Sequence, residues 1–220
     1  MLADDAYWLF HDDTSGRARV PARTAGTVLA AAVLAESSAD GVLDVGPDAV
    51  RAAVATGRPT GPGTAGEDPS RLDVVAAEVL ARVLAEPDTH PLRDWLAALA
   101  RDAPHLVGRR LAGTGAAVER RVRRGLRRDV MYLPTDPIAA AWPTARLTTG
   151  VRAGRRLEPA DTFLLGLAWA TPLAGDVLAD TDPDRRRHAL DRIAHLPPPW
   201  LALVEVSRVA VAAGVLTNRT

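Results

Sequence analysis

The residues best suited to chemistry in this chain are six arginines within positions 118–130, VERRVRRGLRRDV. Plotted at about 100° per residue, Val118, Val122 and Leu126 share an arc of about 80°. The arginines occupy the opposite arc, and they are Arg120, Arg121, Arg123, Arg124, Arg127 and Arg128. The spacing predicts a basic amphipathic helix with an almost purely cationic outer face.

An arginine face of this kind is suited to binding phosphate. The guanidinium group is a planar fork of donors that matches phosphate oxygens bidentately. A basic residue near an anionic lipid surface contributes about 1 kcal/mol, so a few engaged arginines would give a useful and reversible attachment. We therefore expect the six arginines to bind anionic phospholipid headgroups.

Other readings of the arginine face remain open. Its arginines could pair with acids at positions 4, 5, 12 or 13 and form an ordinary solvated surface, or they could meet an acidic protein partner. Nucleic acid also offers phosphate, but the isoelectric point near 7, the aromatic content of 4% and the lack of a base-reading module argue against it.

Residues for catalysis or metal binding are scarce. The chain has no Lys and no Cys, which excludes Schiff-base lysines, phosphate-loop lysines, thiol nucleophiles and Cys-ligated zinc. His11 precedes two aspartates but sits in a turn-like segment, and His188 and His195 lack a third ligand nearby. We predict a protein that is not an enzyme and that needs no metal or cofactor.

Composition indicates a single domain, residues 1–220, with polarised charge. The chain is 47% hydrophobic and carries 27 basic and 27 acidic residues, yet positions 101–128 hold nine arginines and two acids. The longest uncharged runs, 24–35 and 162–175, are shorter than the roughly 20 residues that a bilayer requires. The N-terminus is acidic, unlike a secretory signal. We expect a cytoplasmic protein that meets a membrane only from the side.

The expected fold is mainly α: a single compact helical domain with one β-hairpin following the basic amphipathic helix. Met131–Leu133 and Trp142–Leu147 are the predicted hairpin arms, and residues 57–71 are a predicted exposed loop. Apolar periodicity predicts further helices over residues 2–11, 23–39, 72–84, 159–179, 183–195 and 199–215, and one that follows 88–91. The tryptophans expected in the core are Trp8, Trp95, Trp169 and Trp200.

The order of several short motifs resembles the Golgi phosphoprotein 3 family over almost the whole chain. These motifs are LADDAYWLFHDDTSGR at the start, GTVLAAAVLAESSADGVLDV after it, RPTG followed by RLD, WLAALA, the arginine segment, WPTAR and TDPDRRRHAL. The resemblance implies a mostly helical, non-enzymatic peripheral membrane protein that binds phosphatidylinositol 4-phosphate and acts as an adaptor for membrane proteins. The hairpin would assist binding, so Tyr132 and Trp142 are expected membrane contacts, and a homo-oligomer through the hairpin is a further expectation.

The residues of the family's headgroup pocket are not carried over. Its tryptophan falls at Pro21, its arginine in the long apolar helix at Ala30, and its two later arginines near Gly115 and Val118. The alternative function is a soluble helical scaffold whose arginine face meets an acidic partner. That partner could be the acidic N-terminal segment of another copy.

Overall fold

The structure is a computed structural model that describes residues 1–53, 72–86, 88–124 and 127–217. The described residues form a mainly helical compact domain with two small antiparallel sheets, which confirms the predicted fold class. The elements in its first half are α1 (Leu2–Phe10), α2 (Ala22–Ala39), β1 (Leu43–Val45), β2 (Val50–Ala52), α3 (Val74–Ala85), α4 (Leu92–Leu99) and α5 (Ala103–Gly113). The remaining elements are β3 (Ala117–Arg124), β4 (Arg127–Pro134), α6 (Pro137–Arg152), α7 (Pro159–Trp169), α8 (Ala174–Val177), α9 (Pro183–Asp191), η3 (Arg192–His195) and α10 (Pro198–Thr217).

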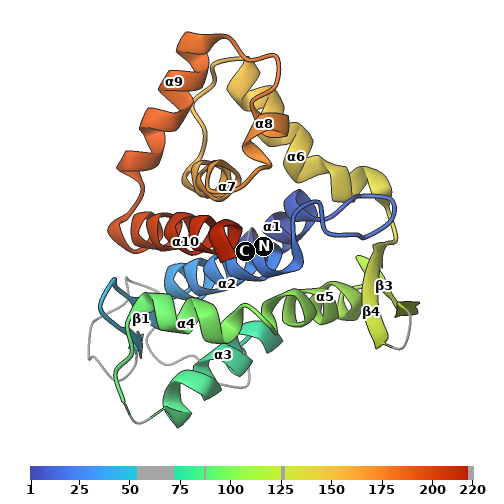
Figure 1. The fold of residues 1–220 in the computed structure, drawn as a ribbon, viewed down its shortest axis with the longest axis vertical. Coiled ribbons are helices and arrows are strands. Elements are labelled where there is room, and N and C mark those ends of the chain that lie inside the picture. The colour runs from blue at the N-terminus through green and yellow to red at the C-terminus, as the bar shows by residue number, and fades with distance from the viewer. Residues whose placement is uncertain (54–71, 87, 125–126, 218–220) are drawn as a thin grey trace.

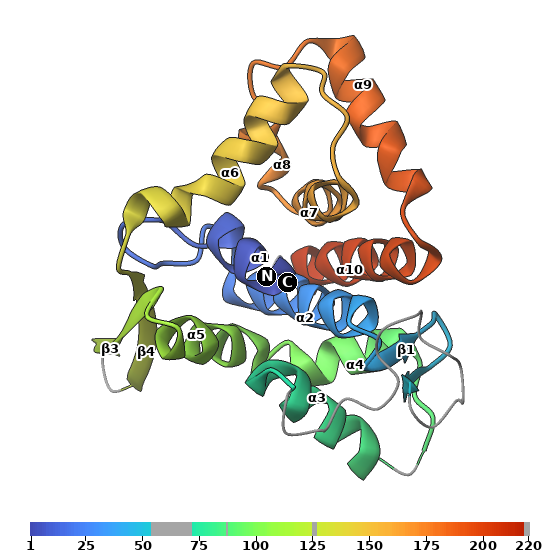
Figure 2. The same cartoon turned by 180° about the vertical axis from the view of Figure 1, so that it is seen from behind.

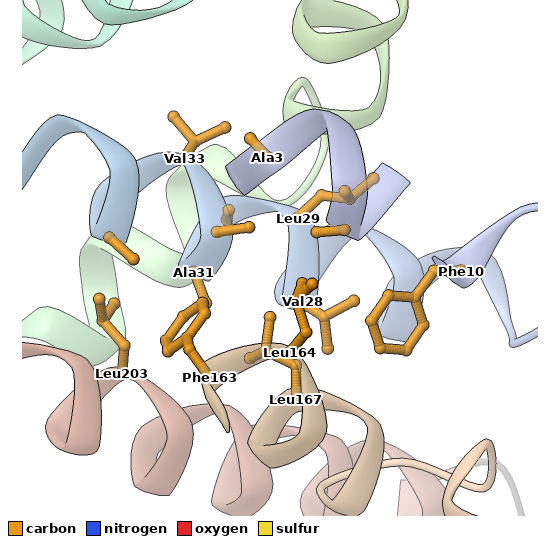
Figure 3. Packing of buried hydrophobic residues seen from close by; sticks show 14 of the residues in the cluster. Ala3, Phe10, Val28, Leu29, Ala31, Val33, Phe163, Leu164, Leu167 and Leu203 are labelled. Carbon is orange, nitrogen blue, oxygen red and sulfur yellow. The ribbon is translucent and has the colours of Figure 1, made fainter. Parts of the chain in front are cut away.

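Helix α2 lies at the centre of the fold, between α10 on one side and α4 and α5 on the other (Figure 1). It is buried almost all round because its sequence is rich in alanine and aliphatic residues, as predicted. Figure 3 shows Phe163 and Leu164 of α7 beside Val28 and Ala31 of α2. Above this layer, α6, α8 and α9 surround α7, and Figure 2 shows the same arrangement from behind.

Two arginines, the buried Arg110 and the partly buried Arg146, connect α1 to distant parts of the chain. Arg110 pairs with Asp4 at 2.7 Å, Glu36 at 2.5 Å and Asp73 at 2.7 Å. Burial opposes the charge of Arg110, but the hydrogen bond with Glu36 raises its pKa and keeps it protonated. Arg146 pairs with Asp5 at 2.9 Å and Asp161 at 2.6 Å. The first two acids of the N-terminal segment are therefore engaged within the fold.

The arginine segment is a β-hairpin, so the predicted basic helix is wrong. Strands β3 and β4 pair antiparallel from Ala117 opposite Pro134 to Arg124 opposite Arg127. A four-residue spacing of apolar positions fits a helix, but it is also a multiple of the two-residue period of a strand. Pairing with β4 favours the strand, because the Val130–Leu133 segment of β4 offers β-forming partners to β3.

The second predicted hairpin arm, Trp142–Leu147, is also wrong, because it lies within α6. Asp136 begins this helix by accepting hydrogen bonds from the backbone N–H groups of Ile138 and Ala139, and Pro137 occupies the first helical position. The Asp136-Pro137 pair, which lies between the two predicted hairpin arms, is thus the start of a helix.

Most other predicted helices are present. The predicted helix 159–179 is divided into α7 and α8, and 183–195 is divided into α9 and η3. Trp8 and Trp95 are buried and Trp200 is partly buried, but Trp169 is 41% exposed at the end of α7, with the Arg186 guanidinium 5.7 Å from its ring. The predicted loop 57–71 lies outside the described residues.

Candidate functional site

A cleft of about 700 Å³ opens between the N-terminal half of the chain and the inner end of the hairpin. Its walls come from the loop after α1, the first turns of α2 and α4, the turn between α4 and α5, strand β4 and the last part of α10. Four arginines line it: Arg17, Arg23, Arg93 and Arg101. No Asp or Glu is among its described lining residues, so the permanently charged side chains of this lining are all positive.

Arg17 is held by a compact turn that leans on the hairpin. Asp12 Oδ1 accepts hydrogen bonds from the Ser15 backbone N–H at 2.7 Å and from the Ser15 hydroxyl at 2.7 Å, and these bonds lower the pKa of Asp12. Gly16 follows with φ of 65° and lies against the Tyr132 carbonyl so closely that a Cβ would clash. The turn therefore presents Arg17 beside β4.

The other three arginines lie at the ends of helices. Arg23 is in the first turn of α2 and Arg93 in the first turn of α4, and neither helix has a side-chain hydrogen bond capping its N-terminus. The partial positive charge of these two helix ends adds to that of the arginines. Arg101 follows α4, where Gly26 allows α2 to approach the Ala100 carbonyl closely.

Among the described residues, three of the four cleft arginines have no carboxylate partner. Arg93 Nε lies 3.3 Å from Asp94 Oδ1. Within the described ranges, no carboxylate oxygen lies within 4.0 Å of Arg17, Arg23 or Arg101. This contrasts with Arg110 and Arg146, whose charges are matched inside the fold. The cleft arginines are thus available to an anion from outside.

The floor of the cleft is aromatic and electrically neutral. The His11 ring stacks on Tyr7 at 3.9 Å between centroids, and its Nδ1–H donates to the Tyr7 carbonyl at 2.8 Å. Burial lowers the pKa of His11 to about 4, so the ring is uncharged at neutral pH. Burial also raises the pKa of Tyr7. His11 supports the cleft by packing, and it contributes no positive charge.

Tyr132 belongs to this floor, so the expectation that it contacts a membrane is wrong. It is 3% exposed, and its ring covers Gly108 of α5. Strand β4 forms one wall of the cleft with Val130, Met131 and Tyr132, so the two strands extend outward from the cleft. Trp142 is not on the hairpin but lies exposed on α6.

The hairpin carries the predicted arginines beyond the cleft. Arg120, Arg121 and Arg123 are exposed, and the nearest acid to Arg121 is Glu119 at 3.9 Å. Register places position 123 opposite 128 and position 124 opposite 127. Like charges at directly opposed positions are unfavourable unless an anion screens them. The side chains of Arg124, Arg127 and Arg128 lie outside the described part of the structure.

The positions that correspond to the family's pocket residues do not form a site here. Ala30 is fully buried in the core, and Gly115 and Val118 lie at the base of the hairpin, away from the cleft lining. Pro21 precedes the cleft residues Ala22 and Arg23. Sequence patterns alone did not identify the cleft arginines. A signal was present for Arg17 and Arg23, because the segment RARVPAR (17–23) holds all three arginines of the otherwise acidic first 50 positions.

Chemistry of other kinds has little support in the described ranges. They contain no group of three or more His, Asp or Glu side chains placed to hold a metal ion. In the same ranges, no helix combines the length and apolar character needed to cross a bilayer. The site that the structure offers is a cationic cleft continued by a cationic hairpin.

Comparison with known proteins identifies the family of the chain. No curated protein matches the sequence. The family described as Golgi phosphoprotein 3 (GPP34) matches residues 2–213, which is nearly the whole chain. This family is known for peripheral Golgi proteins that bind phosphatidylinositol 4-phosphate and are generally not enzymes. The chain therefore belongs to the Golgi phosphoprotein 3 (GPP34) family.

Proposed function

We propose that this protein is a non-enzymatic peripheral membrane protein that binds anionic phospholipid headgroups. The observation that carries the proposal is the cleft, because it has room for a small ligand and its described lining holds four arginines and no acid. A phosphate monoester carries more negative charge than the diester of an ordinary phospholipid. The cleft arginines therefore favour a phosphorylated headgroup, and family membership points to phosphatidylinositol 4-phosphate.

The hairpin has a different role in this proposal. Arg120, Arg121 and Arg123 are exposed on a projecting element and are not part of the cleft lining, so they suit the general negative charge of a cytoplasmic leaflet. Arg124, Arg127 and Arg128 belong to the same proposal by their positions in the register. We infer a two-part attachment, in which the hairpin attracts the surface and the cleft selects the headgroup. Client membrane proteins and self-association through the hairpin are consistent with an adaptor role.

The test is co-sedimentation with vesicles of neutral lipid, of phosphatidylserine, and of phosphatidylinositol 4-phosphate at matched charge. The cleft variant Arg23→Ala/Arg101→Ala should lose the preference for the phosphoinositide. Arg155→Ala/Arg156→Ala is the matched control, because it removes the same charge from exposed residues after α6 and should bind as the wild type does.

The alternative function is a soluble scaffold with an acidic partner, and it would be favoured if no vesicle is bound. The structure weakens one form of it, in which the acidic N-terminal segment of a second copy meets the hairpin. Asp4 and Asp5 are engaged by Arg110 and Arg146, and Asp12 accepts the hydrogen bonds that shape its own turn. A separate acidic protein remains the alternative partner.

A further inference from the structure

The exposed face of the first three turns of α6 carries no free charge. Between Pro137 and Thr149 the only ionisable residue is Arg146, which is ion-paired inward with Asp5 and Asp161. Ile138 is 82% exposed and Trp142 is 60% exposed, and they lie one helical turn apart. The other exposed residues between positions 137 and 149 are Pro137, Ala139, Ala145 and Thr149. A large aromatic and a large aliphatic side chain therefore stand in water on a stretch of helix whose single charged side chain is already ion-paired.

This uncharged face is joined firmly to the base of the arginine hairpin. Thr135, between β4 and α6, donates its backbone N–H to the Ala116 carbonyl at 3.1 Å and its hydroxyl to the Gly115 carbonyl at 2.7 Å. Asp136 then begins α6 by accepting from the Ile138 backbone N–H at 2.9 Å. The hairpin and the start of α6 are adjacent in Figure 1 as well. The base of the hairpin is therefore close to the first turns of α6, which carry Ile138 and Trp142.

A lipid bilayer is the partner that fits both features together. Interfacial helices present apolar and aromatic residues to the acyl-chain boundary while nearby arginines bind anionic headgroups. Tryptophan in particular favours this boundary, because its ring is apolar and its indole N–H remains able to bond to water or headgroups. An acidic protein would complement the arginines but would gain little from an uncharged helix face.

We propose that Ile138 and Trp142 insert into the interfacial region of the membrane and fix how the protein lies on it. This inference rests on the proposed function, since it names a second contact with the same membrane. Electrostatic attraction by the hairpin would bring the surface close, and burial of the two side chains would then slow dissociation. The contact would depend less on salt than the arginine contacts do.

Tryptophan fluorescence with vesicles whose acyl chains are brominated tests the proposal directly, because bromine quenches only rings that enter the bilayer. The vesicles contain phosphatidylserine and phosphatidylinositol 4-phosphate. We expect quenching in the wild type, loss of most of it in Trp142→Phe, and retention in the control Trp169→Phe, whose ring is the other exposed tryptophan. Phenylalanine keeps the apolar contact, so both variants should still bind.

Binding strength gives an independent readout. Ile138→Ala/Trp142→Ala should lower the vesicle partition coefficient by about tenfold, whereas Leu84→Ala/Trp169→Ala, which removes two exposed apolar side chains elsewhere, should leave it unchanged. Normal vesicle binding without bromine quenching, or equal loss in both pairs, would overturn the inference and leave the proposed function standing. Failure of the wild type to bind any vesicle would overturn both.

Discussion

At the scale of single residues, burial determines which ionisable groups can act. Arg110 and Arg146 are matched by carboxylates inside the fold and serve structure, whereas Arg17, Arg23 and Arg101 face the cleft and have no such partner among the described residues. The same distinction applies to His11 and Tyr132, which sequence alone offers as a possible ligand and a membrane contact. Both are interior groups of the cleft floor.

His11 makes the stability of the protein depend on pH. Its pKa falls from 6.5 in the unfolded chain to about 4 in the folded one, because the ring is buried. The folded state therefore disfavours the protonated ring, so the stabilisation is complete above pH 6.5 and is lost as the pH falls toward 4. Full protonation of His11 would lower the free energy of unfolding by about 3 kcal/mol.

Urea unfolding of the wild type and His11→Gln between about pH 4.5 and pH 8 measures this effect, since glutamine can still donate to the Tyr7 carbonyl but does not titrate. The wild-type free energy of unfolding should fall more steeply below pH 6.5 than that of the variant. Parallel curves would contradict the assignment of a buried, neutral His11.

At the scale of elements, apolar periodicity predicted the buried helices well and failed at the hairpin. α2 is surrounded by other elements, and its uninterrupted apolar sequence predicts a helix that is buried on all sides. The spacing of Val118 and Val122 suits a helix or a strand, and the choice depends on pairing with residues in β4. The cleft arginines could not be predicted as a group, because they come from segments that only the tertiary fold brings together.

The hairpin is positioned on α5 by the contact between Gly108 and the Tyr132 ring. A methyl group at position 108 would overlap that ring, so Gly108→Ala should displace β4 and destabilise the fold by about 1–3 kcal/mol. Hydrogen exchange of the β4 amides and urea unfolding would measure the displacement. Gly113→Ala is the matched control on the same helix, where the methyl meets open space and no loss of stability is expected.

At the scale of the whole molecule, the two cationic surfaces should differ in their response to salt. Hairpin arginines are exposed and act over the Debye length, which is about 10 Å at 0.1 M salt, whereas bonds formed inside the cleft are screened less. The affinity of the variant Arg120→Ala/Arg121→Ala/Arg123→Ala for vesicles should therefore fall furthest below that of the wild type at low salt. Its affinity should also change less with salt concentration than the affinity of the wild type does.

The cleft variant Arg23→Ala/Arg101→Ala should show the opposite pattern, with a steep salt dependence and no preference between phosphatidylserine and phosphatidylinositol 4-phosphate. Vesicle titrations between about 0.05 and 0.5 M NaCl compare the two variants. Identical salt dependence in both would contradict the division of roles between hairpin and cleft.

The ion pairs of α1 also have a consequence for synthesis of the chain. Asp4 is 106 residues away from Arg110 in sequence, and Asp5 is 141 residues away from Arg146. Helix α1 is thus synthesised well before the arginines that pair with it, and it also packs against α5 and α6, which come later in the chain. A nascent or truncated chain that ends before residue 146 would expose this helix as a target for chaperones and proteases.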